Sequence, residues 1–85
     1  MKSFKTLEEY VEAALATARY ESIDNGAKVY AEIPAFRGAW AEGRTQKKAR
    51  EELRGVLKGW IELQIERLQS LPAVNGIHPP ELHPA

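Results

Sequence analysis

Three glutamates are the side chains in this chain whose types and spacing come closest to a catalytic pattern. Glu21, Glu32 and Glu42 fall on three successive short segments that alternate apolar and polar residues. Carboxylates gathered at one place can hold Mg²⁺ for phosphoryl transfer. However, no second acid or base has a fixed position beside them, and glutamate is a common solvent-facing residue of strands. A Mg²⁺-dependent nuclease is therefore the weakest of the functions that we consider.

The other potential nucleophiles and metal ligands lack the partners that their chemistry requires. Ser22 and Ser70 have no histidine at a meaningful spacing, so nucleophilic catalysis has no support. His78 and His83 flank the run Pro79-Pro80-Glu81, which offers no rigid frame for a metal ion. The chain contains no cysteine and no glycine-rich phosphate-binding pattern. We expect a protein that is not an enzyme and that has neither a cofactor nor a metal.

Two aromatic residues, Tyr30 and Trp40, share the alternation of the glutamates, with Ile23 beside them. Aromatic side chains on a sheet face can stack RNA bases, but this mode also needs interleaved Arg and Lys. The neighbours here are mostly Glu, which favours a protein-contact face for a basic partner. Two alternatives stay open: an RNA-binding module, and burial of the aromatics under the N-terminal helix or the C-terminal tail. The candidate partner-binding residues are Glu21, Ile23, Tyr30, Glu32, Trp40 and Glu42.

Two amphipathic helices are predicted, one on each side of these segments in the sequence. Thr6 and Glu9 form a T-x-x-E capping box, and apolar residues then recur at helical spacing, which predicts a helix from Leu7 to Ala18. Thr45 is the predicted N-cap of a long second helix that continues to about Leu71. The expected buried stripe of the second helix is Ala49, Leu53, Val56, Leu57, Trp60, Ile61, Gln64 and Leu68.

Three short strands are predicted between the helices. Asn25-Gly26 joins two strand-like runs, and both residues tolerate the positive φ of a type I′ hairpin turn. A two-residue turn fixes the register and sets Glu21 opposite Tyr30. Pro34 ends the second strand because proline has no N–H to donate. The predicted antiparallel meander is Tyr20–Asp24, Lys28–Ile33 and Ala39–Glu42, and the fold class is α+β.

Length and composition set further limits. A chain of 85 residues forms one domain, predicted at residues 1–71, followed by a proline-rich tail at 72–85. Its core is thin, since so short a chain buries only about 60% of its unfolded surface, and we expect a homo-oligomer, either a dimer or a tetramer. The 12 basic and 12 acidic residues cancel, which argues against non-specific DNA binding.

No targeting or membrane segment is evident. No apolar run approaches the roughly 20 residues that cross a membrane. The basic start, Met1-Lys-Ser-Phe-Lys5, is not followed by the apolar stretch of a signal peptide. We expect a cytoplasmic protein without a membrane partner.

The run Tyr30-Ala-Glu-Ile-Pro-Ala-Phe-Arg-Gly-Ala-Trp-Ala-Glu-Gly43, with Thr45, Ala49, Leu53 and Trp60 after it, resembles the HicB-like antitoxin family. Members of that family typically read Y-x-x-x-x-P-x-L-P-G-x-x-x-x-G-x-T, and the resemblance covers about Arg19 to Leu71. It implies a three-stranded sheet packed by one helix, a partial ribonuclease-H-like fold that lacks the catalytic acids. It also implies a dimer or a higher oligomer and, in many members, neutralisation of a small basic messenger-RNA-cleaving toxin, HicA.

The chain departs from the family pattern in three ways. A helix precedes the first strand, Arg37 stands where proline is usual, and the sequence after Leu71 is too short for the DNA-binding segment that many HicB antitoxins carry. We therefore expect no DNA binding from this chain.

Overall fold

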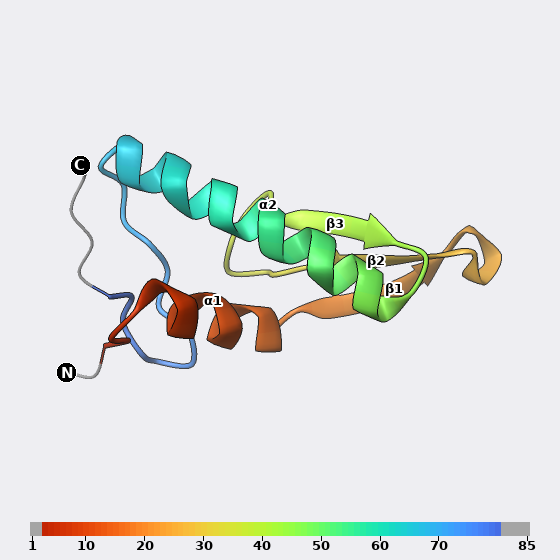
Figure 1. Cartoon of the computed structure of the whole chain (residues 1–85), viewed down its shortest axis with the longest axis horizontal. Coiled ribbons are helices and arrows are strands. Elements are labelled where there is room, and N and C mark those ends of the chain that lie inside the picture. Colours follow the sequence, from red (N-terminus) through yellow and green to blue (C-terminus); the bar gives the residue numbers. More distant parts are fainter. Residues whose placement is uncertain (1–2, 81–85) are drawn as a thin grey trace.

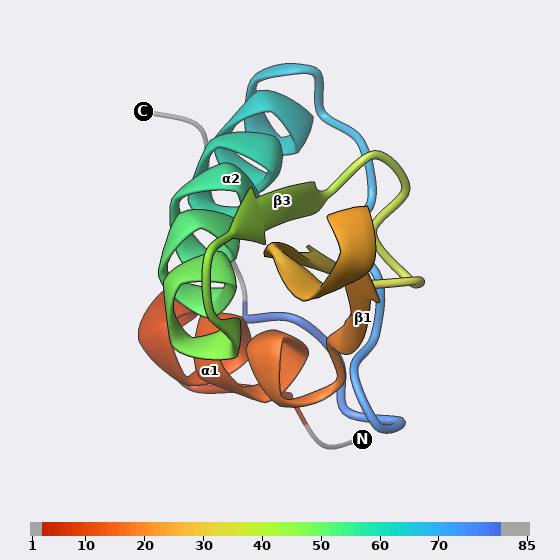
Figure 2. The same cartoon turned by 90° about the vertical axis from the view of Figure 1, so that its right-hand side faces the viewer.

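The long C-terminal helix packs on one side of a three-stranded antiparallel sheet, and the N-terminal helix packs against that long helix (Figure 1). The structure, a computed structural model, describes residues 3–80. In chain order its elements are α1 (Leu7–Ala16), β1 (Arg19–Ile23), a short turn η1 (Asp24–Gly26), β2 (Lys28–Glu32), β3 (Trp40–Gly43) and α2 (Gln46–Glu66). The strands form one sheet in the order β1-β2-β3 (Figure 1), and the view along the strands in Figure 2 places both helices on the same side. The predicted α+β fold class is confirmed.

Helix α1 begins at the predicted capping box. The Glu9 amide donates to the Thr6 hydroxyl oxygen at 3.1 Å, and the Glu9 carboxylate accepts from the Lys5 amide at 3.4 Å rather than from the amide of Thr6. The helix ends at Ala16, two residues before the predicted end, because the next amide bonds a carbonyl three residues back and closes a tighter turn.

The β1–β2 hairpin has the predicted type I′ turn. Asn25 has φ 56° and ψ 34°, Gly26 has φ 88°, and the Ala27 amide donates to the Asp24 carbonyl oxygen at 3.0 Å. Asp24 also has a positive φ of 51°, so β1 ends at Ile23, one residue earlier than predicted. The ladder keeps the predicted register.

The core lies between the helices and the inner face of the sheet. Ala31 and Ala41 point from the sheet into this core, which settles the alignment of β3 with Trp40 and Glu42 on the other side. The exposed ion pair of Glu12 with Arg54 links α1 to α2 and adds little free energy. The buried residues are Tyr10, Val11, Ala14, Leu15, Ala31, Ile33, Phe36, Ala39, Ala41, Ala49, Leu53, Leu57, Ile61 and Val74.

Helix α2 starts as predicted but is shorter than its apolar stripe indicates. The Lys48 amide donates to the Thr45 hydroxyl at 3.1 Å, which caps the N-terminus. The helix stops at Glu66 because Leu68 takes a left-handed conformation with φ 55°, and the following amide, of Gln69, returns to a carbonyl five residues back. Leu68 is 78% exposed and Val56 is also exposed, so the predicted places of both in the buried stripe are wrong.

The segment Pro72–Pro80 packs back along α1. The Tyr10 hydroxyl donates to the Pro72 carbonyl oxygen at 2.6 Å, and the Phe4 amide donates to the His78 carbonyl oxygen at 2.9 Å. Val74 is buried in the core. The segment near Ser3 and the segment Pro72–Pro80 therefore run together at the end of the molecule away from the β1–β2 turn (Figure 1). The last part of the predicted tail, with Glu81 and His83, lies outside the described residues.

Candidate functional site

The outer face of the sheet, which is the face turned away from both helices, carries all six residues singled out from the sequence. Within the ladder Tyr30 pairs with Glu21 on one side and with Glu42 on the other, while Glu32 pairs with Trp40. Directly opposed residues lie on the same face of a sheet, and Ala31 of β2 and Ala41 of β3 are buried on the opposite, inner face. The outer face comprises Arg19, Glu21, Ile23, Lys28, Tyr30, Glu32, Trp40 and Glu42.

Tyr30 and Trp40 form a stacked pair at the centre of this face. Their ring centroids are 5.8 Å apart and their planes differ by 27°. Trp40 keeps 51% of its surface exposed, so neither helix and no part of the segment Pro72–Pro80 covers it. Burial of these aromatics within the described chain, one alternative left open by the sequence, is therefore wrong for Trp40.

The surroundings of the Tyr30 hydroxyl are negative. This hydroxyl donates to the Glu32 Oε2 atom at 3.3 Å. Partial burial raises the pKa of Tyr30, and the charges of Glu32, Glu21 and Glu42 raise it further because they oppose the phenolate. All three carboxylates therefore act electrostatically on the same point of the outer face.

Two cations lie at the margins of the outer face. Lys28 Nζ is 3.9 Å from the nearest carboxylate oxygen of Glu42 and 3.8 Å from that of Asp24, both exposed and weak pairs. Arg19 stands opposite Glu32 in the ladder at the other end of β1. The negative character of the outer face is thus concentrated around the aromatic pair.

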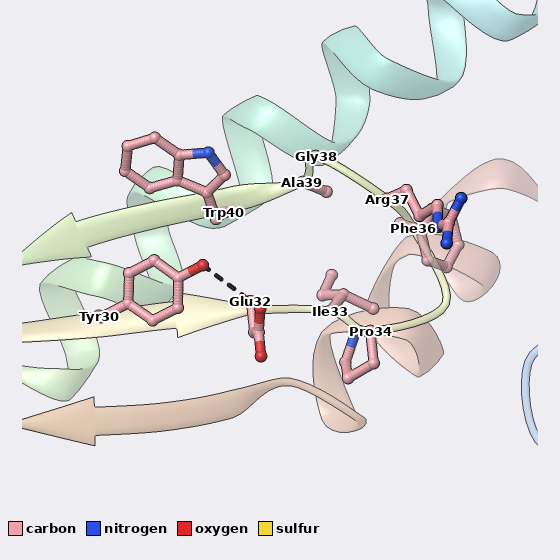
Figure 3. A pocket seen from close by; sticks show the side chains of 9 residues that line it. All are labelled: Tyr30, Glu32, Ile33, Pro34, Phe36, Arg37, Gly38, Ala39 and Trp40. Carbon is pink, nitrogen blue, oxygen red and sulfur yellow. Dashed lines mark hydrogen bonds between the residues drawn. The ribbon is translucent and has the colours of Figure 1, made fainter.

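A shallow groove of about 430 Å³ opens beside the Tyr30–Trp40 pair and runs toward the β2–β3 connection. Figure 3 shows the Tyr30 and Trp40 rings at one end of it, Glu32 between the strands, and Arg37 at the far end. The residues that line the groove are Tyr30, Glu32, Ile33, Pro34, Phe36, Arg37, Gly38, Ala39 and Trp40.

Phe36 anchors the loop that forms this far end. Its ring is buried and packs edge-on against Trp60 of α2, with centroids 5.0 Å apart. The Trp60 indole Nε1 donates to the Arg37 carbonyl oxygen at 2.9 Å. Gly38 adopts φ 85°, which suits the second central position of the turn closed by the bond from the Ala39 amide to the Phe36 carbonyl, 2.9 Å long. Sequence reasoning missed these positioning roles, although one large aromatic within a turn-forming segment is a recognisable sign of an anchored loop.

The Mg²⁺ site considered for the three glutamates is not assembled in the part of the chain that the structure describes. Across residues 3–80, no three His, Cys, Asp or Glu side chains are grouped to hold a metal ion. Glu21, Glu32 and Glu42 share the outer face without forming such a group. Within the same residues, neither helix is long and apolar enough to span a bilayer.

Comparisons with known proteins agree with this arrangement. Residues 9–72 match a family described as UPF0150-like. Among solved structures, the crystal structure of TTHA0281 from Thermus thermophilus resembles the chain with a TM-score of 0.82 and 32% sequence identity. The likeness covers 95% of this chain and 100% of the other. No curated protein matches the chain.

Proposed function

Since the chain belongs to the UPF0150-like family and leaves the outer face of its sheet uncovered, we propose that it is a non-enzymatic protein-interaction module of the HicB-like type. In this proposal the chain binds and neutralises a small, basic, RNA-cleaving toxin. The observation that carries the proposal is the exposed Tyr30–Trp40 stack with carboxylates on both sides of it.

The composition of the outer face supports a protein partner. Aromatic side chains in the centre of a contact patch supply much of the binding free energy when they are desolvated. Carboxylates around them steer a basic partner and reject acidic ones. Tyr30 and Trp40 meet the first condition, and Glu21, Glu32 and Glu42 meet the second.

The proposal includes a homo-oligomer in the cytoplasm. Val56 and Leu63, seven residues apart on one flank of α2, keep 39% and 42% of their surface exposed. Gly59 lies between them, and a Cβ built there would meet nothing within 4 Å, so another chain can approach closely. A second copy bound along this side of α2 leaves the outer face free for the toxin. Sedimentation that gives a monomer at micromolar concentration contradicts the oligomer.

Co-expression with the product of the adjacent gene tests whether the chain neutralises a toxin. We expect that product to arrest growth alone, and to be tolerated and co-purified when the intact chain is present. Trp40→Ala should lose protection, whereas Leu68→Ala, which changes a still more exposed apolar residue beyond the end of α2, should retain it. A neighbouring product that is neither toxic nor bound refutes the antitoxin function.

An RNA-binding module is the second candidate, and the stacked Tyr30–Trp40 pair is the observation that favours it. Stacked aromatic rings accept unpaired bases of any sequence. The three carboxylates around the pair count against it because they repel phosphate. Tryptophan fluorescence that stays unchanged when single-stranded RNA is titrated at low salt removes this candidate.

A further inference from the structure

The outer face has one place where a flat cation would meet an aromatic surface and a carboxylate together. Resting on the proposed function, we propose that the groove beside Tyr30 and Trp40 is a seat for an arginine side chain of the protein partner. The guanidinium would stack on the Trp40 ring and donate to Glu32.

The aromatic part of this seat is already arranged. Trp40 is held by its stacking on Tyr30 while half of its surface stays open to solvent. Trp is the aromatic side chain that best attracts a cation to its ring face, and arginine adds planar stacking to that attraction. An arginine can therefore bind here with little rearrangement of the two rings.

The carboxylates next to the rings retain unused acceptor capacity. Glu32 accepts the Tyr30 hydroxyl through Oε2, and its Oε1 atom has no hydrogen bond among residues 3–80. Within the same residues Glu21 makes neither a side-chain hydrogen bond nor an ion pair, and Glu42 has only the long contact with Lys28 at 3.9 Å. A guanidinium has several donors in a fixed fork and can engage such an acceptor while it stacks, which a lysine ammonium cannot do.

The charges also distinguish arginine from the other possible occupants of the groove. A second copy of this chain, related by a two-fold axis through the face, would bring a second set of the same three glutamates against the first. RNA would bring phosphates into a field that already opposes the ionisation of Tyr30. Arg19 opposite Glu32 and Lys28 beside Glu42 offset only part of the charge of the three glutamates, so a basic side chain is the occupant that lowers the electrostatic energy of this face.

Amide NMR of the full chain provides the test, with N-acetyl-arginine amide as the probe. N-acetyl-citrulline amide is the matched control because it keeps the shape of arginine without the charge. Trp40 gives an indole N–H signal that reports on the groove, and the amides of α1, none of whose residues lines the groove, serve as the internal reference. We expect the Trp40 indole and the amides around Glu32 to shift and saturate with arginine, and to shift far less with citrulline or in high salt.

Two substitutions sharpen the result. Trp40→Leu keeps an apolar side chain but removes the ring, and Glu32→Gln keeps the shape but removes the charge. We expect each to weaken arginine binding by about three- to tenfold, which corresponds to a free-energy loss of the size measured for exposed cation–π and ion pairs. Leu68→Ala should bind like the parent chain.

Several outcomes overturn the arginine seat. They are equal shifts with citrulline, unchanged affinity in Trp40→Leu, shifts confined to other surfaces, or a stronger response to single-stranded RNA than to arginine. Self-association that perturbs the same outer-face signals as the protein concentration rises would assign the groove to a second copy. If a toxin binds through Trp40 but arginine does not, the seat fails and the proposed function stands. If arginine binds but no toxin exists, the proposed function fails on its own.

Discussion

Replacing Gly43 by alanine tests how β3 is held against α2. Gly43 is the last residue of β3 and pairs with Val29 in the ladder. A Cβ built at this glycine would lie 2.4 Å from the backbone nitrogen of Ala49 and 2.7 Å from the carbonyl carbon of Lys48. Both are backbone atoms of the first turns of α2, so no side chain can rotate away to make room.

The size of the expected effect follows from these distances. An ordinary contact begins at 3.4 Å, so the N-terminal end of α2 must move by 3.4 − 2.4, or 1.0 Å, relative to β3. Overpacking of this kind costs about 1–3 kcal/mol, and we expect the upper end because the core on the other side of α2 resists the shift. A loss of about 3 kcal/mol lowers the Tm of a domain this size by roughly 12–24 °C.

Urea unfolding followed by far-UV circular dichroism measures the change. Gly55→Ala is the matched control, because it is the same chemical substitution on an exposed part of α2 where nothing lies within 4 Å. Replacing a helical glycine by alanine should stabilise the chain by about 1 kcal/mol. The two substitutions should thus have opposite signs. A Gly43→Ala variant as stable as the parent chain would show that β3 and α2 are not in direct backbone contact.

Three further predictions concern single side chains. Tyr10→Phe removes the hydrogen bond to the Pro72 carbonyl and should lower the unfolding free energy by about 1 kcal/mol in urea, whereas no loss would contradict a bound tail segment. Leu68→Gly removes the strain of a left-handed backbone at a mostly exposed residue and should raise the unfolding free energy by about 1 kcal/mol. A lower unfolding free energy would contradict the assigned end of α2. Glu32→Gln should lower the raised pKa of Tyr30, measured by tyrosinate absorbance. The fold favours the neutral phenol of Tyr30, so the resulting stabilisation of the folded state is fully present below the unfolded pKa of about 10. It disappears as the pH rises through the higher pKa of the folded state. Because Glu32→Gln lowers the folded pKa, the pH range between the two pKa values should become narrower.

The sheet and the outer face could be predicted from the sequence because one turn determines them. Asn25-Gly26 permits only a tight turn with positive φ, and a turn of that length leaves a single register for β1 and β2. The alternation of Ala39 and Ala41 with Trp40 then extends the assignment to β3. Local rules were sufficient here, since every step involved residues close together in the sequence.

Other features depend on contacts that local rules do not contain. The end of α2 was missed because Leu68 continues the apolar spacing, and leucine is not the residue that usually takes a left-handed helix cap. Phe36 lies in a loop by sequence but in the core by packing, since Trp60 and Tyr10 meet it from distant segments. The place of Val74 in the core likewise follows from tertiary packing alone.

The long sequence separation of the contact between Tyr10 and Pro72 also predicts when this contact forms during folding. It joins residues separated by 62 positions in the chain, whereas the β1–β2 hairpin closes over a few residues. Closing a long loop costs more conformational entropy than closing a short one, so the hairpin should form early and α1 should be covered last. During synthesis, α1 leaves the ribosome long before the segment that covers it. The apolar side of α1 can therefore be covered by the segment Pro72–Pro80 only after nearly the whole described chain has emerged.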